Sequence, residues 1–138
     1  MSADLPVFVL DGFALLSHFQ DENGSGRMVA LFEQAQREEC RLLMSVINLG
    51  EICYIIERRR GFQAVQIALS AAESLPVEIL PVNQEDVLAA AHLKAQYPIS
   101  YAGASAVAAA QANAAALVTG DPELKALENI LSIEWLMR

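Results

Sequence analysis

The sequence predicts an α/β fold with a mostly parallel central sheet of about four to five strands and helices on both faces. Three observations support this prediction. Short apolar runs alternate with longer stretches of helical period along the whole chain. The runs are apolar at successive positions, which is typical of strands buried on both faces. Strands that alternate with helices form βαβ units, whose strands are parallel. No repeat, linker or change of composition divides the 138 residues, so we expect one domain over 1–138.

Apolar periodicity places the elements along the chain. The short continuous runs predict strands at 7–10, 42–44, 77–80, 117–119 and 132–135. The stretches with apolar residues three and four apart predict helices at 12–19, 27–38, 46–59, 62–74, 84–97, 102–114 and 122–128.

Turn and capping residues set the boundaries of the first half. The segment Asp21-Glu22-Asn23-Gly24-Ser25-Gly26 is rich in turn residues and predicts a loop. Ser45 follows the second strand and is a good N-cap for the next helix. Gly61 interrupts the helical pattern, so this helix ends at about Arg59.

Capping residues and prolines also set the element boundaries of the second half. Asn83 caps the fifth helix, and Pro98 ends it. Ser100 opens an alanine-rich helix. Pro122 stands where a first-turn proline is tolerated, which predicts a short helix after the fourth strand.

Composition excludes several classes of protein. Hydrophobic residues make up 54% of the chain and charged residues 19%, so it is not a disordered tail. Nine Lys and Arg against 17 Asp and Glu give a net charge of −8, which excludes a uniformly basic surface but leaves a local basic patch open. Cys40 and Cys53 are expected to be reduced thiols or small core residues. The alanine-rich stretch is only weakly apolar, so we expect no membrane span and a cytoplasmic protein.

Three acidic residues follow strands that should share one edge of the sheet. Asp11 ends the first strand, Asp121 follows the fourth, and Glu51 lies about two turns into the helix after the second. Ligands of open parallel sheets bind at the carboxyl ends of the strands. Carboxylates gathered there repel one another unless a cation neutralises them, and oxygen ligands suit Mg²⁺ or Mn²⁺. Such a metal activates water for attack on a phosphodiester.

Each acid also has a simpler explanation. An Asp at the end of a strand is often a turn former or a helix cap, and Glu51 alone is compatible with a solvated helical residue. Only the expected meeting of the three at one edge favours a site.

The chain also resembles a known family. The motifs are Val-Leu-Asp11-Gly-Phe-Ala-Leu-Leu, Met44-Ser-Val-Ile-Asn48-Leu-Gly-Glu51, Leu93-Lys-Ala with Ser100-Tyr-Ala, and Val118-Thr-Gly-Asp121-Pro-Glu. In order and spacing they are similar to the motifs of VapC-type PIN domains, the toxin ribonucleases of toxin–antitoxin pairs. The resemblance covers essentially the whole chain and implies a three-layer PIN-like fold.

The resemblance also implies a function. It predicts an endoribonuclease that depends on Mg²⁺ or Mn²⁺, forms a homodimer and binds a cognate antitoxin over its active groove. By position, Asp11, Glu51 and Asp121 match acidic metal-site residues. Thr119 matches a polar residue that supports the site, and Asn48 one that lies near it.

One position departs from the family pattern. Where the family has Ser-Tyr-Ala-Asp-Ala, this chain has Ser100-Tyr-Ala-Gly103-Ala, so a central carboxylate is missing. Fewer anionic ligands weaken the binding of divalent cations. The resemblance therefore predicts that Gly103 weakens or abolishes activity. Glu123 lies close to Asp121 and could partly substitute as a ligand, but a first-turn acid that favours the helix dipole is the simpler interpretation.

Arg58-Arg59-Arg60 is the basic cluster of the sequence. It is a candidate contact for RNA phosphates, and it is equally explained as a set of cations at a helix C-terminus.

Two other functions remain open on the sequence alone. One is a non-catalytic PIN-like domain that binds RNA or an antitoxin. The other is a different α/β phosphoryl-transfer protein, which the sequence disfavours because Asp11-Gly-Phe13 lacks the second Asp of an Asp-x-Asp site.

Overall fold

A computed structural model describes residues 4–20 and 24–136 of the chain. Five parallel strands form one sheet in the order β3-β2-β1-β4-β5. The strands are β1 (Val7–Leu10), β2 (Arg41–Ser45), β3 (Glu78–Leu80), β4 (Ala116–Thr119) and β5 (Ile133–Trp135). The helices are α1 (Gly12–Phe19), α2 (Ser25–Gln36), α3 (Val46–Arg60), α4 (Phe62–Glu73), α5 (Gln84–Gln96), α6 (Tyr101–Ala112) and the 3₁₀-helix η1 (Pro122–Leu127).

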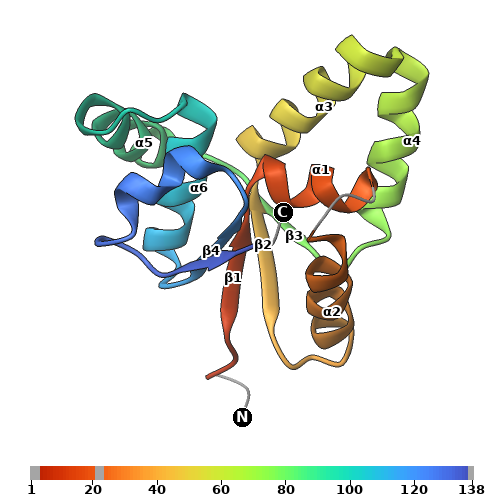
Figure 1. Cartoon of the computed structure of the whole chain (residues 1–138), viewed down its shortest axis with the longest axis horizontal. Helices are drawn as coiled ribbons and strands as arrows, with labels where there is room; N and C mark the ends of the chain where they lie inside the picture. The colour runs from red at the N-terminus through yellow and green to blue at the C-terminus, as the bar shows by residue number, and fades with distance from the viewer. Residues whose placement is uncertain (1–3, 21–23, 137–138) are drawn as a thin grey trace.

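The sheet separates two layers of helices, as the sequence predicts. In Figure 1, α1 to α4 lie on one side of the strands, and α5 and α6 lie on the other. Successive residues of each strand point to opposite faces. Leu10 and Val118 accordingly pack in the core beneath α1 to α4, whereas Val9 and Leu117 pack in the core beneath α6. The molecule is a three-layer α/β fold.

Strand β1 occupies the centre of the sheet. Its Val9 is in register with Leu43 of β2 on one side and with Leu117 of β4 on the other. Because these strands are parallel, the residues that follow β1 and β4 emerge at the same edge. This edge carries the candidate site.

Side-chain caps fix the starts of three helices. The Ser45 side chain accepts from the Ile47 N–H at the start of α3, and Ser100 caps α6 in the same way. The helix α5 has a complete capping box between Asn83 and Asp86. Gly61 takes φ = +88°, a conformation that favours glycine, and separates α3 from α4.

Two expectations need correction. Residues 25 and 26 belong to α2 rather than to a loop, because Gly24 takes φ = +99° and starts the helix two residues early. Residues 21–23 of the expected loop lie outside the described residues. The element after β4 is a 3₁₀-helix and not an α-helix, with Asp121 as its N-cap and Pro122 as its first residue.

Both cysteines are free thiols, Cys40 buried and Cys53 partly buried. Within the described part of the chain, no helix has the length and apolar character needed to cross a bilayer.

Candidate active site

A cleft of about 240 Å³ lies at the carboxyl ends of β1 and β4. The acids expected there are present: Asp11 directly follows β1, Asp121 follows β4 by two residues, and Glu51 lies in α3. The complete lining is Asp11, Phe13, Leu16, Asn48, Glu51, Ile55, Arg59, Ser100, Gly103 and Asp121. The fold therefore brings together side chains that lie up to 110 positions apart in the sequence, Asp11 and Asp121 being the extremes.

Asp11 is the most deeply buried acid of the cleft, with 5% of its surface exposed. Its Oδ1 accepts from the Ala14 N–H at 2.9 Å as the N-cap of α1, and its Oδ2 accepts from the Thr119 hydroxyl at 2.5 Å. Burial raises the pKa of Asp11 to about 7; the two hydrogen bonds oppose this rise, and the charges of Glu51 and Asp121 add to it. Without a cation, this carboxyl gives up its proton only at about pH 7, well above the ordinary range of an Asp.

Thr119 connects two of the acids. Its hydroxyl donates to Asp11, and its Oγ1 accepts from the Asp121 N–H at 3.0 Å. The side chain of Thr119 is completely buried at the end of β4. The resemblance implies a supporting role for Thr119, and the structure places its hydroxyl between Asp11 and the Asp121 N–H.

The chain of hydrogen bonds continues beyond Asp121. Oδ1 of Asp121 accepts from the Glu123 N–H at 3.1 Å, and Oε1 of Glu123 accepts from the Ser100 N–H at 2.9 Å. Glu123 is thereby fixed between η1 and the start of α6. Glu123 is also the acid in the first turn of η1.

Glu51 reaches the cleft from the second turn of α3. Its Oε1 accepts from Asn48 Nδ2 at 3.4 Å and lies where a Cβ on Gly12 would be. Burial raises the pKa of Glu51, the hydrogen bond from Asn48 opposes the rise, and the charges of Asp121 and Glu123 increase it. Asp121 and Glu123 are therefore near enough to Glu51 for their charges to act on it.

Asn48 is fully buried beside Glu51. Its Nδ2 also donates to the Ala102 carbonyl at 3.0 Å, which connects α3 to the first turn of α6. Its Oδ1 has no hydrogen-bond partner. A buried acceptor without a donor is costly, and a cation or a water molecule would satisfy it.

The three arginines diverge, because consecutive helical residues point in different directions. Arg59 lines the cleft. The Arg58 guanidinium stacks on the Tyr54 ring at 5.0 Å from its centroid, and Arg60 lines a separate groove between α1 and α4. The structure therefore places only Arg59 of this cluster on the candidate site.

The donor set fits a hard divalent cation. All the candidate ligands are oxygens, burial and the charges of neighbouring acids raise the pKa of Asp11 and of Glu51, and the buried Asn48 Oδ1 has no hydrogen-bond partner. Across residues 4–20 and 24–136, no three His, Cys, Asp or Glu side chains already form a group that would hold a metal ion. Mg²⁺ requires less than such a group, because it commonly binds one or two carboxylates and keeps several waters.

The family follows from the sequence match. Residues 8–130 match the PIN domain family. The chain belongs to this family. The matched range contains every candidate site residue, from Asp11 to Glu123. No curated protein matches the chain.

Solved structures share the fold of this PIN domain. A chain of VapBC2 from Rickettsia felis, bound to a DNA fragment from the promoter, has a TM-score of 0.74 at 18% identity, with 95% of this chain and 99% of that chain covered. DNA-bound VapBC from Salmonella typhimurium gives 0.70 at 17% identity, covering 94% and 98%. VapC20 from Mycobacterium tuberculosis, a toxin that cleaves the sarcin-ricin loop, gives 0.65 at 16% identity, covering 86% and 93%.

Two glycines that shape the PIN domain site were not singled out by the sequence analysis as parts of it. Gly12 leaves space for the Glu51 carboxylate, and Gly120 leaves space for the Phe13 ring at the rim of the cleft. A glycine directly after a strand-end acid was the available signal for Gly12. For Gly120, the signal was its position between Thr119 and Asp121.

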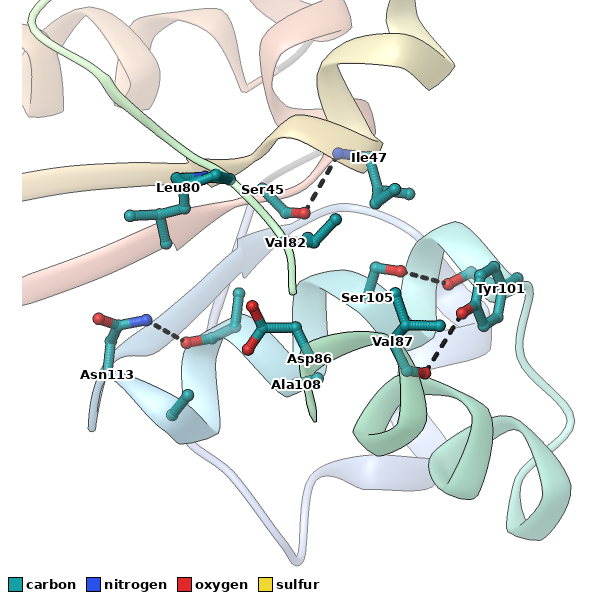
Figure 2. A pocket seen from close by; sticks show the side chains of 13 residues that line it. Ser45, Ile47, Leu80, Val82, Asp86, Val87, Tyr101, Ser105, Ala108 and Asn113 are labelled. Atoms are coloured by element: carbon teal, nitrogen blue, oxygen red, sulfur yellow. Dashed lines mark hydrogen bonds between the residues drawn. The ribbon is translucent and has the colours of Figure 1, made fainter. Parts of the chain in front are cut away.

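A second cavity of the PIN domain, about 210 Å³, lies between α5, α6 and the ends of β2 and β3. Figure 2 shows Leu80, Val82 and Val87 around it, with the Tyr101 hydroxyl donating to the Val87 carbonyl at 3.3 Å. Its one acid, Asp86, is held in the α5 capping box. This cavity lacks the grouped carboxylates and is not the candidate active site.

Proposed function

We propose that this PIN domain is the toxin of a toxin–antitoxin pair, a cytoplasmic endoribonuclease that cleaves RNA phosphodiesters with Mg²⁺ or Mn²⁺. One observation carries the proposal: Asp11, Glu51 and Asp121 meet in a single cleft at the carboxyl edge of the sheet. The family and the fold shared with VapC toxins support it.

In this proposal, Asp11, Glu51 and Asp121 would hold the cation, and its chemistry when bound would be the activation of a water for in-line attack on the phosphodiester. Thr119 fixes the orientation of Asp11, and Asn48 fixes that of Glu51. Arg59 lies on the same cleft and provides a positive charge for an RNA phosphate.

The glycine at position 103 removes a possible ligand from α6. With fewer anionic oxygens, the affinity of the cleft for a divalent cation falls, and activity falls with it, unless another side chain supplies the missing oxygen.

Three partners belong to the proposal: an RNA substrate, a cognate antitoxin and a second copy of the chain. The antitoxin is supported by structural neighbours that are VapBC complexes. Exposed apolar side chains on α3 and α4, such as Tyr54, Phe62 and Ile67, offer surface for protein contacts.

A second candidate function is binding without catalysis, to RNA or to an antitoxin. It is favoured by Gly103 and by the absence, among the described residues, of a ready group of three metal-binding side chains.

Cleavage of a total RNA pool separates the two functions. We expect the purified chain to cleave RNA with Mn²⁺ and not with EDTA, and we expect Glu51→Gln and Asp121→Asn to reduce cleavage at least tenfold. Glu85→Gln is the matched control, because Glu85 is an exposed acid in the first turn of α5, outside the cleft. RNA binding without cleavage by the wild-type chain, even at high Mn²⁺, would support the non-catalytic function instead.

A further inference from the structure

The first turn of α6 lacks a carboxylate that its capping pattern calls for. In α5 the capping box is complete: Asp86 stands at the third helical position, and its Oδ2 accepts from the Asn83 N–H at 3.0 Å. In α6 the third position is Gly103, whose N–H donates to Ser100 Oγ at 2.9 Å. Glycine has no side chain that could accept from the Ser100 N–H in return.

Glu123 supplies that acceptor from another element. Its Oε1 accepts from the Ser100 N–H at 2.9 Å, although the two residues lie 23 positions apart. The Glu123 carboxylate thus completes the capping box of α6 and accepts the hydrogen bond that an acid at position 103 would accept.

The space for this carboxylate exists because residue 103 is glycine. A Cβ on Gly103 would lie 3.0 Å from Glu123 Oε1 and 3.1 Å from Ser100 Oγ. Both distances are shorter than ordinary van der Waals contacts, so a larger residue at 103 would require the Glu123 carboxylate to shift by a few tenths of an ångström.

Glu123 lies beside the cleft, next to two of the residues that line it. Ser100 and Gly103, its two neighbours, both line the cleft, and its charge acts on Glu51. An independent observation indicates that this cleft takes a ligand: Oδ1 of the fully buried Asn48 is unpartnered, and Asn48 lines the cleft beside Glu51. A cation or its bound water would satisfy this acceptor.

We propose that Glu123 is the fourth carboxylate of the cation site, and that Gly103 is the residue that admits it. This inference rests on the proposed function, since it assumes that Asp11, Glu51 and Asp121 bind a divalent cation. It replaces the expectation of a site impaired at Gly103 with that of a site whose fourth acid comes from η1.

Mn²⁺ titration of the full chain by calorimetry tests the inference without reference to activity. Glu123→Gln keeps an oxygen that can accept from the Ser100 N–H but removes the charge. We expect it to weaken Mn²⁺ binding about tenfold or more and to leave thermal unfolding in EDTA unchanged. A purely structural role for Glu123 would leave Mn²⁺ binding unaltered.

Gly103→Ala gives a second test that leaves every acid in place. We expect it to weaken Mn²⁺ binding as well, because its Cβ displaces the Glu123 carboxylate. In the Glu123→Gln background, Gly103→Ala should cost nothing further, since the two changes act through the same group. Gly50→Ala is the matched control, because a Cβ there meets nothing within 4 Å.

An exchange of positions completes the design. Gly103→Asp should restore Mn²⁺ binding in the Glu123→Ala background, where no long side chain at 123 occupies the space beside residue 103, whereas in the wild-type background it crowds Glu123 and should not improve binding. Wild-type binding by Glu123→Gln would overturn the inference and leave the proposed function standing. Failure of the wild-type chain itself to bind Mn²⁺ would overturn both.

Discussion

The hydroxyl of Thr119 donates to Oδ2 of Asp11 at 2.5 Å and joins the ends of two neighbouring strands across 108 positions of sequence. Both side chains are buried, so water cannot replace this hydrogen bond. Thr119→Val keeps the shape of the side chain and removes the donor. We expect a loss of about 1–3 kcal/mol in the free energy of unfolding at pH 8, measured in urea. Thr119→Ser retains the hydroxyl and should lose less; equal losses would show that the methyl group matters rather than the hydrogen bond.

The raised pKa of Asp11 predicts that stability falls as the pH rises. Between the ordinary pKa of 3.8 and about 7, the folded chain holds a proton on Asp11 that the unfolded chain has released. The stabilisation is therefore complete below pH 3.8 and is lost as the pH passes 7. At about 1.4 kcal/mol per pKa unit, the decrease amounts to about 4 kcal/mol. Urea unfolding at pH 5 to 8 should show the part of this decrease that falls between pH 5 and 7, about 3 kcal/mol, in the wild type and a flatter profile in Asp11→Asn.

Divalent cations should reverse this effect. If Asp11 helps to hold Mn²⁺, saturating Mn²⁺ raises the stability of the wild type at pH 8, and EDTA removes the gain. Asp11→Asn should gain much less from Mn²⁺ in the same thermal unfolding experiment. Equal gains for both proteins would indicate that Mn²⁺ binds elsewhere.

Because Gly12 lies close to the Glu51 carboxylate, we expect a methyl group added at position 12 to disturb the cation site. In Gly12→Ala the new Cβ would overlap Oε1 of Glu51 and force this carboxylate to move. We expect lower Mn²⁺ affinity and slower RNA cleavage, with little loss of stability because alanine favours the helix by about 1 kcal/mol over glycine. Gly26→Ala in α2, where a Cβ meets nothing within 4 Å, should leave both properties unchanged.

The divergence of the three arginines predicts unequal effects on RNA binding. Arg59→Gln should weaken binding to single-stranded RNA and reduce the magnitude of the salt slope by about 0.7, the value for one lost phosphate contact. Arg58→Gln should have less effect, because its guanidinium lies on the Tyr54 ring. Binding isotherms at several salt concentrations measure both. Equal losses would mean that RNA follows the whole end of α3 rather than the cleft.

The sequence was sufficient for the features that depend on local chemistry. Apolar runs and caps located β1, β4 and the start of α3, because burial on both faces and capping by Ser45 are encoded within a few residues. The meeting of Asp11 and Asp121 was also predictable, since parallel strands end at a common edge.

Contacts between distant segments could not be predicted from local sequence patterns. The hydrogen bond from the Ser100 N–H to Glu123 depends on how η1 packs against α6, which no short motif encodes. The 3₁₀ geometry of η1 was missed because a first-turn proline is compatible with either kind of helix. The separation of Arg58 from Arg59 depends on the rotation of α3 about its axis relative to the cleft.

The helix α3 carries Glu51 near one end of the cleft and Arg59 eight residues later. With a rise of 1.5 Å per residue, their backbones are held about 12 Å apart. The negative charge of Glu51 and the positive charge of Arg59 thus lie on one rigid helix. A nucleic-acid strand bound in the cleft must match this fixed spacing. Any displacement of α3 would therefore move Glu51 and Arg59 together, because both side chains belong to the same helix.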